Sequence, residues 1–163
     1  MDCKCWDRGI REDHETLDSQ AGALKFVLEH PSGPRDRRVA VGQILRSFGP
    51  RLESHLWKEE HVFFPALRQL LGSNAGMLEI LLSQHGELRE HLRRLTDLLE
   101  DPNRPWEDVA RTGQCLVELL EEHEEKEGRF LLEILEFSLQ PEELMALARQ
   151  FRETVCQPSE EVA

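Results

Sequence analysis

Six histidine and glutamate residues interrupt apolar stripes that otherwise repeat with helical periodicity. They are His14, His55, Glu59, His85, His123 and Glu127. Burying an imidazole or a carboxylate without a partner is costly. One such interruption would be unremarkable, but six of them in four segments require a common partner. Because imidazoles and carboxylates together are typical ligands of transition-metal ions, the pattern predicts a metal site.

Two pairs of these residues share one spacing. Glu59 follows His55 by four residues, and Glu127 follows His123 by four residues. Residues four apart lie on the same face of a helix, so each HxxxE pair aims an imidazole and a carboxylate at one point. His14 and His85 are predicted from their places in the stripes, and in an antiparallel bundle all six residues fall in one layer.

The chemistry of this ligand set limits the metal. Four imidazoles and two carboxylates suit iron or manganese better than calcium or magnesium. A structural zinc ion needs only four ligands, so six ligands, two of them able to bridge, favour two ions. The Glu-x-x-His pattern of ferritin-like proteins is absent, because no glutamate lies three residues before any histidine. Haem is disfavoured because the sequence has no CxxCH and because axial histidines would leave the two glutamates unexplained.

Four long segments must carry these residues. Clusters of proline, glycine and asparagine at residues 30–34, 72–76 and 101–105 separate the segments, and a fourth break falls at 138–141. Apolar residues between the breaks recur in steps of three and four, as in helices that face their neighbours in a bundle. The sequence therefore predicts an all-α fold, an antiparallel up-down-up-down four-helix bundle with an additional short C-terminal helix.

The predicted stripes name the residues that should face the bundle axis. The second segment gives Val41, Leu45, Phe48, Leu52, His55, Glu59, Val62 and Ala66. The third gives Leu78, Leu81, His85, Leu88, Leu92, Leu95 and Leu99. The fourth gives Val109, Thr112, Leu116, Leu120, His123, Glu127, Phe130, Ile134 and Phe137.

The same patterns divide the chain. They predict a flexible N-terminus over residues 1–9, the bundle over 10–137, a C-terminal helix over 141–155 and a disordered tail over 156–163. The amphipathic C-terminal helix either folds over one end of the bundle or forms a contact in a homodimer.

Composition excludes several function classes. The 163 residues carry 32 acidic and 20 basic side chains and a net charge of −12, which disfavours binding to nucleic acid or to anionic membranes. No apolar run approaches the roughly 18 residues that a membrane helix needs. The N-terminus lacks the apolar stretch of a signal peptide, so we expect a cytoplasmic location. Cys3 and Cys5 are predicted to be free thiols at a frayed terminus, with metal binding or redox sensing as the alternative.

The ordered set of a histidine, an HxxxE, a second histidine and a second HxxxE resembles the hemerythrin-like, or HHE cation-binding, domain. The stretch HLWKEEHVFFPAL from His55 to Leu67 is also typical of that family. The resemblance covers about residues 10–137. It implies a non-haem di-iron centre in which both glutamates bridge the irons beside an oxo or hydroxo group, with manganese or zinc as substitutes. His14 and His55 would complete one iron, and His85 and His123 would complete the other.

The sequence departs from oxygen-carrying hemerythrins at two positions. Those proteins have a fifth histidine four residues after the one matching His85, where this chain has Arg89. Their last carboxylate matches Gly128, whereas this chain provides Glu127 one residue earlier. A free coordination position would stay open, or water or one of three nearby glutamates would fill it: Glu60, Glu90 or Glu124. Arg89 either packs its stem while its head reaches solvent or pairs with an acid, or it gates or supports the site.

Open positions favour chemistry or sensing over reversible oxygen carriage. The leading hypothesis is therefore a di-iron protein that binds or senses O2, NO or peroxide. Two alternatives stay open: an enzyme (a peroxidase, an NO reductase or an iron donor for iron–sulfur repair), or an iron storage or regulatory protein. The sequence contains no tyrosine, which excludes a tyrosyl-radical role. The other histidines, His30, His61 and His91, are predicted not to be ligands.

Overall fold

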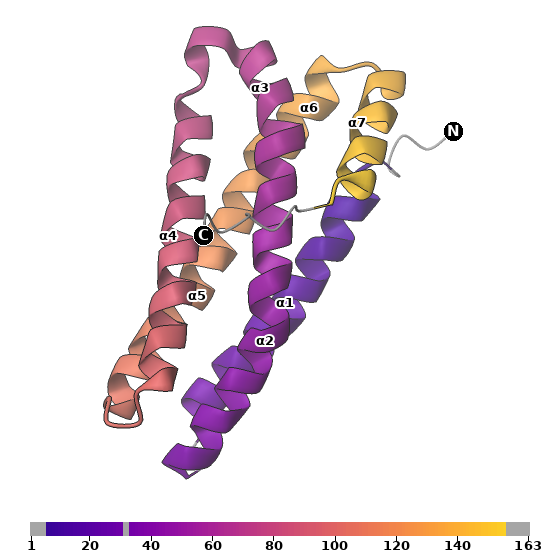
Figure 1. The fold of residues 1–163 in the computed structure, drawn as a ribbon. Coiled ribbons are helices and arrows are strands. Elements are labelled where there is room, and N and C mark those ends of the chain that lie inside the picture. Colours follow the sequence, from indigo (N-terminus) through magenta and orange to yellow (C-terminus); the bar gives the residue numbers. More distant parts are fainter. Residues whose placement is uncertain (1–5, 31–32, 156–163) are drawn as a thin grey trace, which may run out of the picture.

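The computed structural model describes residues 6–30 and 33–155, which are almost entirely helical (Figure 1). The helices are α1 (Arg8–Glu29), α2 (Pro34–Lys58), α3 (Phe64–Leu71), α4 (Gly76–Glu100), α5 (Trp106–Glu127), α6 (Glu133–Ser138) and α7 (Pro141–Glu153). Two π-helical turns, Glu59–Phe63 and Gly128–Leu132, join α2 to α3 and α5 to α6, and a short 3-10 turn, Gly72–Asn74, precedes α4. The predicted all-α fold is confirmed, and no strand occurs within these ranges.

The long helices form four rods that lie side by side (Figure 1). The rods are α1, α2 with its continuation α3, α4, and α5 with its continuation α6. Packing closes into a ring, because α1 contacts α2 and α5 while α4 contacts α5 and α2. The arrangement is consistent with a four-helix bundle, and the helix ends fall at the predicted breaks.

A proline and a glycine explain where the π-helical turns form. Pro65 has no N–H and its ring would clash with the carbonyl four residues earlier, so the helix widens before it. The N–H of Phe64 then donates to the carbonyl of Glu59, five residues back. The second turn begins at Gly128, and glycine is among the weakest helix formers. Each turn adds one residue to its rod.

This extra residue makes the predicted stripes wrong beyond both turns. After the first turn Leu67 is buried rather than the predicted Ala66. After the second, Leu131 and Leu135 are fully buried, while the predicted Phe137 is 93% exposed. The stripes had assumed an unbroken α-helical period, and the π-helical turns shift the buried face by one position.

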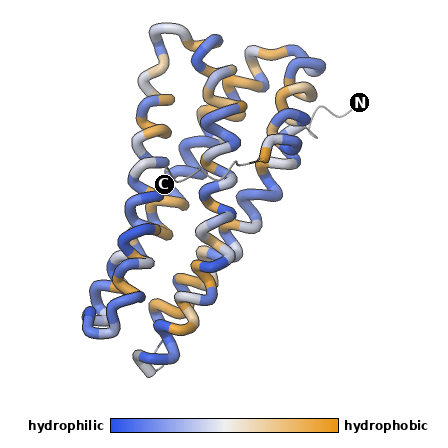
Figure 2. Tube along the Cα trace, viewed as in Figure 1, coloured by the Kyte–Doolittle hydropathy of each residue, from blue (hydrophilic) through white to orange (hydrophobic). Residues whose placement is uncertain are grey.

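Two hydrophobic clusters fill the bundle, one on each side of the six polar residues. Leu88 belongs to the first cluster and Leu81 to the second, and His85 lies between them on α4. The rod of α5 repeats this order, with Leu120 before the second HxxxE and Leu131, in the π-helical turn, after it. Figure 2 shows hydrophobic and hydrophilic positions alternating every few residues along each rod.

Within residues 6–30 and 33–155 no helix has the length and apolar character needed to cross a membrane.

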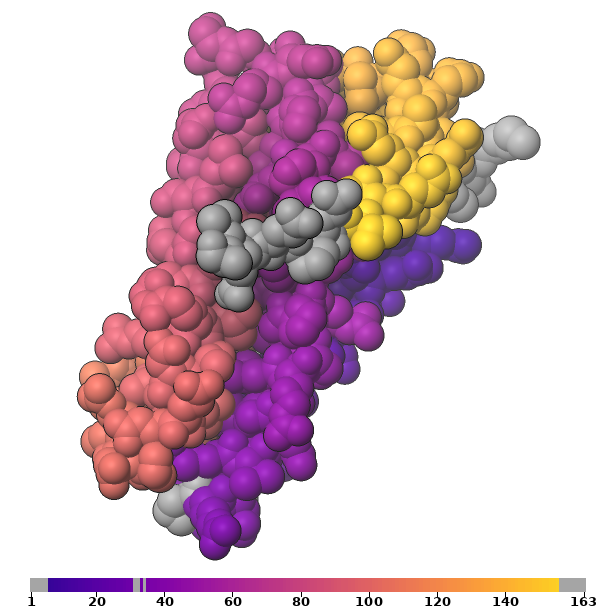
Figure 3. Space-filling model, viewed as in Figure 1, coloured from indigo at the N-terminus to yellow at the C-terminus, as the bar shows by residue number. Residues whose placement is uncertain are grey.

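The C-terminal helix α7 folds over one end of the bundle. Pro141 occupies its first turn, and Gln140 and Glu143 form a capping box. It contacts α1 and the first π-helical turn. Figure 3 shows α7 in yellow against the outside of the bundle. The Phe151 ring stacks on Phe63 with a centroid distance of 4.7 Å. The apolar face of α7 is therefore covered by the chain itself.

The bundle and the C-terminal helix begin and end within two residues of their predicted boundaries. Helix α1 begins at Arg8, two residues before the predicted start of the bundle, and Trp6 is already buried in the second cluster. Helix α7 ends at Glu153, close to the predicted residue 155. The proposed roles of Cys3 and Cys5 and the predicted tail over 156–163 lie outside the described residues.

We expect Phe151→Ala to lower the free energy of unfolding by about 3–5 kcal/mol, because it empties a fully buried aromatic site. Phe137→Ala is the matched control, since this ring is 93% exposed and should change stability by less than about 0.5 kcal/mol. Urea unfolding followed by circular dichroism measures both. Equal effects of the two substitutions would contradict the packing of α7.

Candidate metal centre

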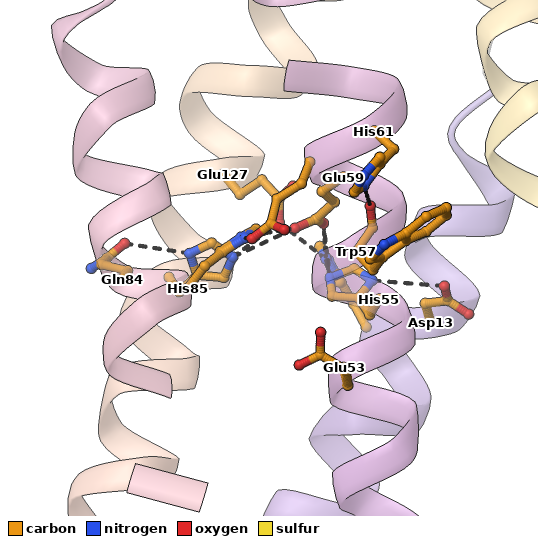
Figure 4. Close-up of polar contacts among 12 residues, drawn as sticks. Asp13, Glu53, His55, Trp57, Glu59, His61, Gln84, His85 and Glu127 are labelled. Atoms are coloured by element: carbon orange, nitrogen blue, oxygen red, sulfur yellow. Dashed lines mark hydrogen bonds and ion pairs between the residues drawn. The ribbon is translucent and has the colours of Figure 1, made fainter. Parts of the chain in front are cut away.

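The six predicted residues converge between the two hydrophobic clusters. They form two groups, one of His14, His55, Glu59 and Glu127 and the other of Glu59, His85 and His123. Within each group the candidate ligand atoms lie within 4.8 Å of one another. Figure 4 shows Glu59 and Glu127 pointing toward each other between His85 and His55. The predicted layer therefore exists, with all four rods contributing to it.

Glu59 presents one oxygen to each group. Its Oε1 lies 2.8 Å from Nε2 of His55 and 4.0 Å from Nε2 of His14. Its Oε2 lies 3.2 Å from Nε2 of His85 and 3.7 Å from Nε2 of His123. A carboxylate placed in this way has the arrangement needed to bridge two cations.

Glu127 lies on the other side of the same space. Its Oε2 is 3.3 Å from Nε2 of His14 and 3.8 Å from Nε2 of His123. The Nε2 atoms of His14 and His55 are 3.2 Å apart, so the first group is compact. Both HxxxE pairs thus place histidine and glutamate together, as their spacing predicts.

Several of these buried atoms lack a hydrogen-bond partner among the described residues. Glu59, His85, His123 and Glu127 are 0% exposed and His55 is 1% exposed, whereas the His14 side chain is 15% exposed. Among the described residues, neither carboxylate has a hydrogen-bond partner for either oxygen, and Nε2 of His85 and of His123 has none. Buried acceptors without donors cost free energy that a cation would recover. The residues therefore fit a metal centre.

The carboxylates shift the pKa values of the imidazoles. Burial lowers the pKa of His14, but the neighbouring carboxylates of Glu127 and Glu59 outweigh burial and raise that pKa to about 11. Burial likewise opposes the raised pKa of His55, about 9, which the charge of Glu59 produces. Burial raises the pKa of Glu127, and the neighbouring charge of Glu59 raises it further. In the metal-free chain, protons on histidine thus compensate the buried carboxylate charge.

Three polar side chains behind the imidazoles were not predicted in these roles. Glu60 Oε1 lies 2.8 Å from Nδ1 of His85, and Gln84 Oε1 lies 3.4 Å from Nδ1 of His123. Asp13 Oδ2 lies 3.7 Å from Nδ1 of His55. Such partners orient the opposite ring nitrogen toward a metal. Asp13 and Gln84 directly precede His14 and His85 in sequence, yet each serves a different histidine.

The three glutamates considered as substitute ligands lie outside both groups of described residues. Glu60 meets the outer nitrogen of His85, and hydrogen bonds from His85 and Arg89 overcome its burial and lower its pKa to about 2. Glu90 is exposed and pairs with Arg93 at 2.7 Å. Glu124 is half-buried, and loss of hydration raises its pKa to about 8.

Arg89 and the three histidines predicted not to be ligands lie outside the two groups of described residues. The Arg89 head pairs with two acids, Glu53 and Glu60, as one of its two predicted roles allowed. His61 stacks on Trp57, and His30 stacks on Phe26. His30, His61 and His91 all lie outside both groups of described residues, as expected for residues that are not ligands.

The helical fold and the two groups of histidine and carboxylate side chains at its centre together define a class of metal-binding helical bundle proteins. A family model described as the Hemerythrin HHE cation binding domain matches residues 7–135. The chain belongs to this family, which confirms the resemblance seen in its motifs.

Comparison with curated proteins found relatives named iron-sulfur cluster repair protein YtfE. The one from Escherichia coli O81 (strain ED1a) is 30% identical over 129 residues, 74% of this chain and 57% of that protein. The one from Citrobacter koseri is 29% identical over the same shares. The chain thus spans little more than half the length of these relatives. A comparison with solved structures found no significant match.

The raised histidine pKa values predict how pH changes the stability of the metal-free chain. A group whose pKa is raised on folding stabilises the folded chain most at pH values below its unfolded pKa, here 6.5. This contribution is lost as the pH rises through the folded pKa. We expect the free energy of unfolding, measured with urea and chelator, to fall between pH 6.5 and pH 9. His14→Gln should reduce this fall. Constant or rising stability over that range would contradict the ion pairs.

Proposed function

We propose that this chain holds two non-haem iron ions in a bundle of antiparallel, up-down-up-down order. The short connections between successive rods, such as residues 72–75 and 101–105, support that order. One ion would be held by His14 and His55, the other by His85 and His123. Glu59 and Glu127 would bridge them with an oxo or hydroxo group, and manganese or zinc are the substitutes. The observation that carries this proposal is Glu59, which offers each group one oxygen free of hydrogen bonds.

The function that this site supports best is binding or sensing of O2, NO or peroxide. Bound iron supplies redox chemistry and a coordination position for such a ligand. The chain supplies two hydrophobic clusters that exclude water and side chains that orient the imidazoles. In the metal-free chain Glu127 lies in the group of His14 only. Bridging by both glutamates would give each ion two imidazoles and two carboxylate oxygens, so both ions would keep a position for such a ligand.

A second candidate is an iron donor for damaged iron–sulfur clusters. The relatives named iron-sulfur cluster repair proteins favour it, although the chain spans only 57% of their length. His14 supports it too, because its side chain is 15% exposed and could give an ion a way out. Here iron is the cargo. An enzyme that turns over peroxide or NO, and an iron store or regulator, are the other outcomes that the experiments below separate.

The two-iron proposal predicts about two iron ions per chain after anaerobic loading with Fe(II). His55→Ala combined with His123→Ala should leave well under one, because it removes one imidazole from each group. His61→Ala is the control, since this exposed ring stacks on Trp57 away from both groups. Metal analysis gives the ratio, and optical spectra before and after O2, NO or peroxide identify the ligand. Two retained ions in the double variant would refute the proposed ligands.

The donor and sensor candidates differ in what happens to the iron. A donor should restore a protein that carries a damaged cluster faster than free iron does in the presence of a chelator, and it should lose iron stoichiometrically. A binder or sensor should keep its iron and change only its spectrum. Glu127→Ala should weaken iron binding about tenfold or more and abolish either behaviour. Sustained turnover of peroxide or NO with the iron retained would instead identify an enzyme.

A further inference from the structure

Arg89 binds two carboxylates of the neighbouring rod. Its Nε and Nη2 donate to Oε2 and Oε1 of Glu53 at 2.8 and 3.0 Å. Its Nη1 and Nη2 donate to Oε1 and Oε2 of Glu60 at 2.7 and 3.2 Å. Both contacts are bidentate, a geometry that fixes orientation as well as distance. Every guanidinium nitrogen donates to one of these two carboxylates, and among the described residues none of the nitrogens contacts the six candidate ligands.

Glu60, which Arg89 holds, also contacts His85, a candidate ligand. The same Oε1 that accepts from Arg89 lies 2.8 Å from Nδ1 of His85. The opposite nitrogen of that ring, Nε2, lies 3.2 Å from Oε2 of Glu59. A connected path therefore runs from Glu53 through Arg89, Glu60 and His85 to the carboxylate shared by both groups.

His85 has the firmest such partner among the buried imidazoles. His123 relies on Gln84, a neutral amide at 3.4 Å. Nδ1 of His55 is 3.7 Å from Asp13, and among the described residues it makes no hydrogen bond. His85 also belongs to the group with only three ligand atoms, where the aim of each ring matters most.

We propose that Arg89 is a positioning residue for the second metal ion, the one that His85 and His123 would hold. It fixes Glu60, whose carboxylate holds the Nδ1–H of His85 and thereby points Nε2 at the metal position. The residue that occupies the place of a fifth histidine thus supports a ligand instead of adding one. The effect on metal affinity rests on the proposed two-ion function. The hydrogen bond between Glu60 and His85 exists without metal.

The test compares Arg89→Met with Arg93→Met in the full chain. Arg93 lies one turn further along α4 and also holds two acids, Glu90 and Asp97, but it is 61% exposed and remote from the ligands. Nitrogen-15 NMR of labelled histidine in the metal-free chain detects the protected Nδ1–H of His85, assigned by its loss in His85→Gln. We expect Arg89→Met to abolish this protected signal and Arg93→Met to preserve it.

Titration with Co(II) adds a second readout. In Arg89→Met the second ion should bind about 10–100-fold more weakly while the first changes less than about twofold. Arg89→Lys, which keeps the charge but not the bidentate geometry, should give an intermediate result, and it carries the test if Arg89→Met does not fold.

Two outcomes would overturn the inference. One is a protected His85 Nδ1–H that survives loss of Arg89. The other is second-ion affinity that is unchanged, or is weakened equally by Arg93→Met. A wild-type chain that binds only one ion would overturn the proposed function instead, because the NMR signal requires no metal.

Discussion

Two carboxylates, Glu59 and Glu127, are wholly buried at the height of four imidazoles, and the rest of the structure is arranged around them. A buried charge destabilises a fold unless an opposite charge meets it. In the metal-free chain the raised pKa values of His14 and His55 show how protons meet this need. Cations would meet it by displacing those protons, so folding, protonation and metal binding are linked in this bundle.

The π-helical turns explain how two HxxxE pairs face one layer while the rods continue past it. The first turn begins at Glu59 itself and precedes Pro65, and the second begins at Gly128, directly after Glu127. One added residue rotates the following helix by about 100° relative to an unbroken one. The rods can therefore present polar residues to the layer and then bury a different face, which includes Leu67 and Leu135, against the second cluster.

Local spacing made most of the centre predictable from sequence. His55 and Glu59, like His123 and Glu127, are neighbours on one helix face, and their contact needs no knowledge of the fold. His14 and His85 required only the stripes and an antiparallel order. The burial pattern beyond the turns was not predictable, because periodicity assumes a constant helical repeat. Asp13 and Gln84 were missed because each reaches a histidine on another rod, a contact that no spacing within one helix encodes.

The two groups differ in ways that would make two bound ions unequal. The first has four ligand atoms and includes His14, which reaches solvent, whereas the second has three atoms on residues that are 0% exposed. An ion held by His85 and His123 would lie among wholly buried residues, so its affinity would depend on how firmly each ring is held. The contact of Glu60 with His85, and that of Arg89 with Glu60, supply that support from outside the centre. The place of a fifth imidazole is thus taken by an arginine that would orient a ligand instead of adding one, which accords with a site that binds or senses a small molecule.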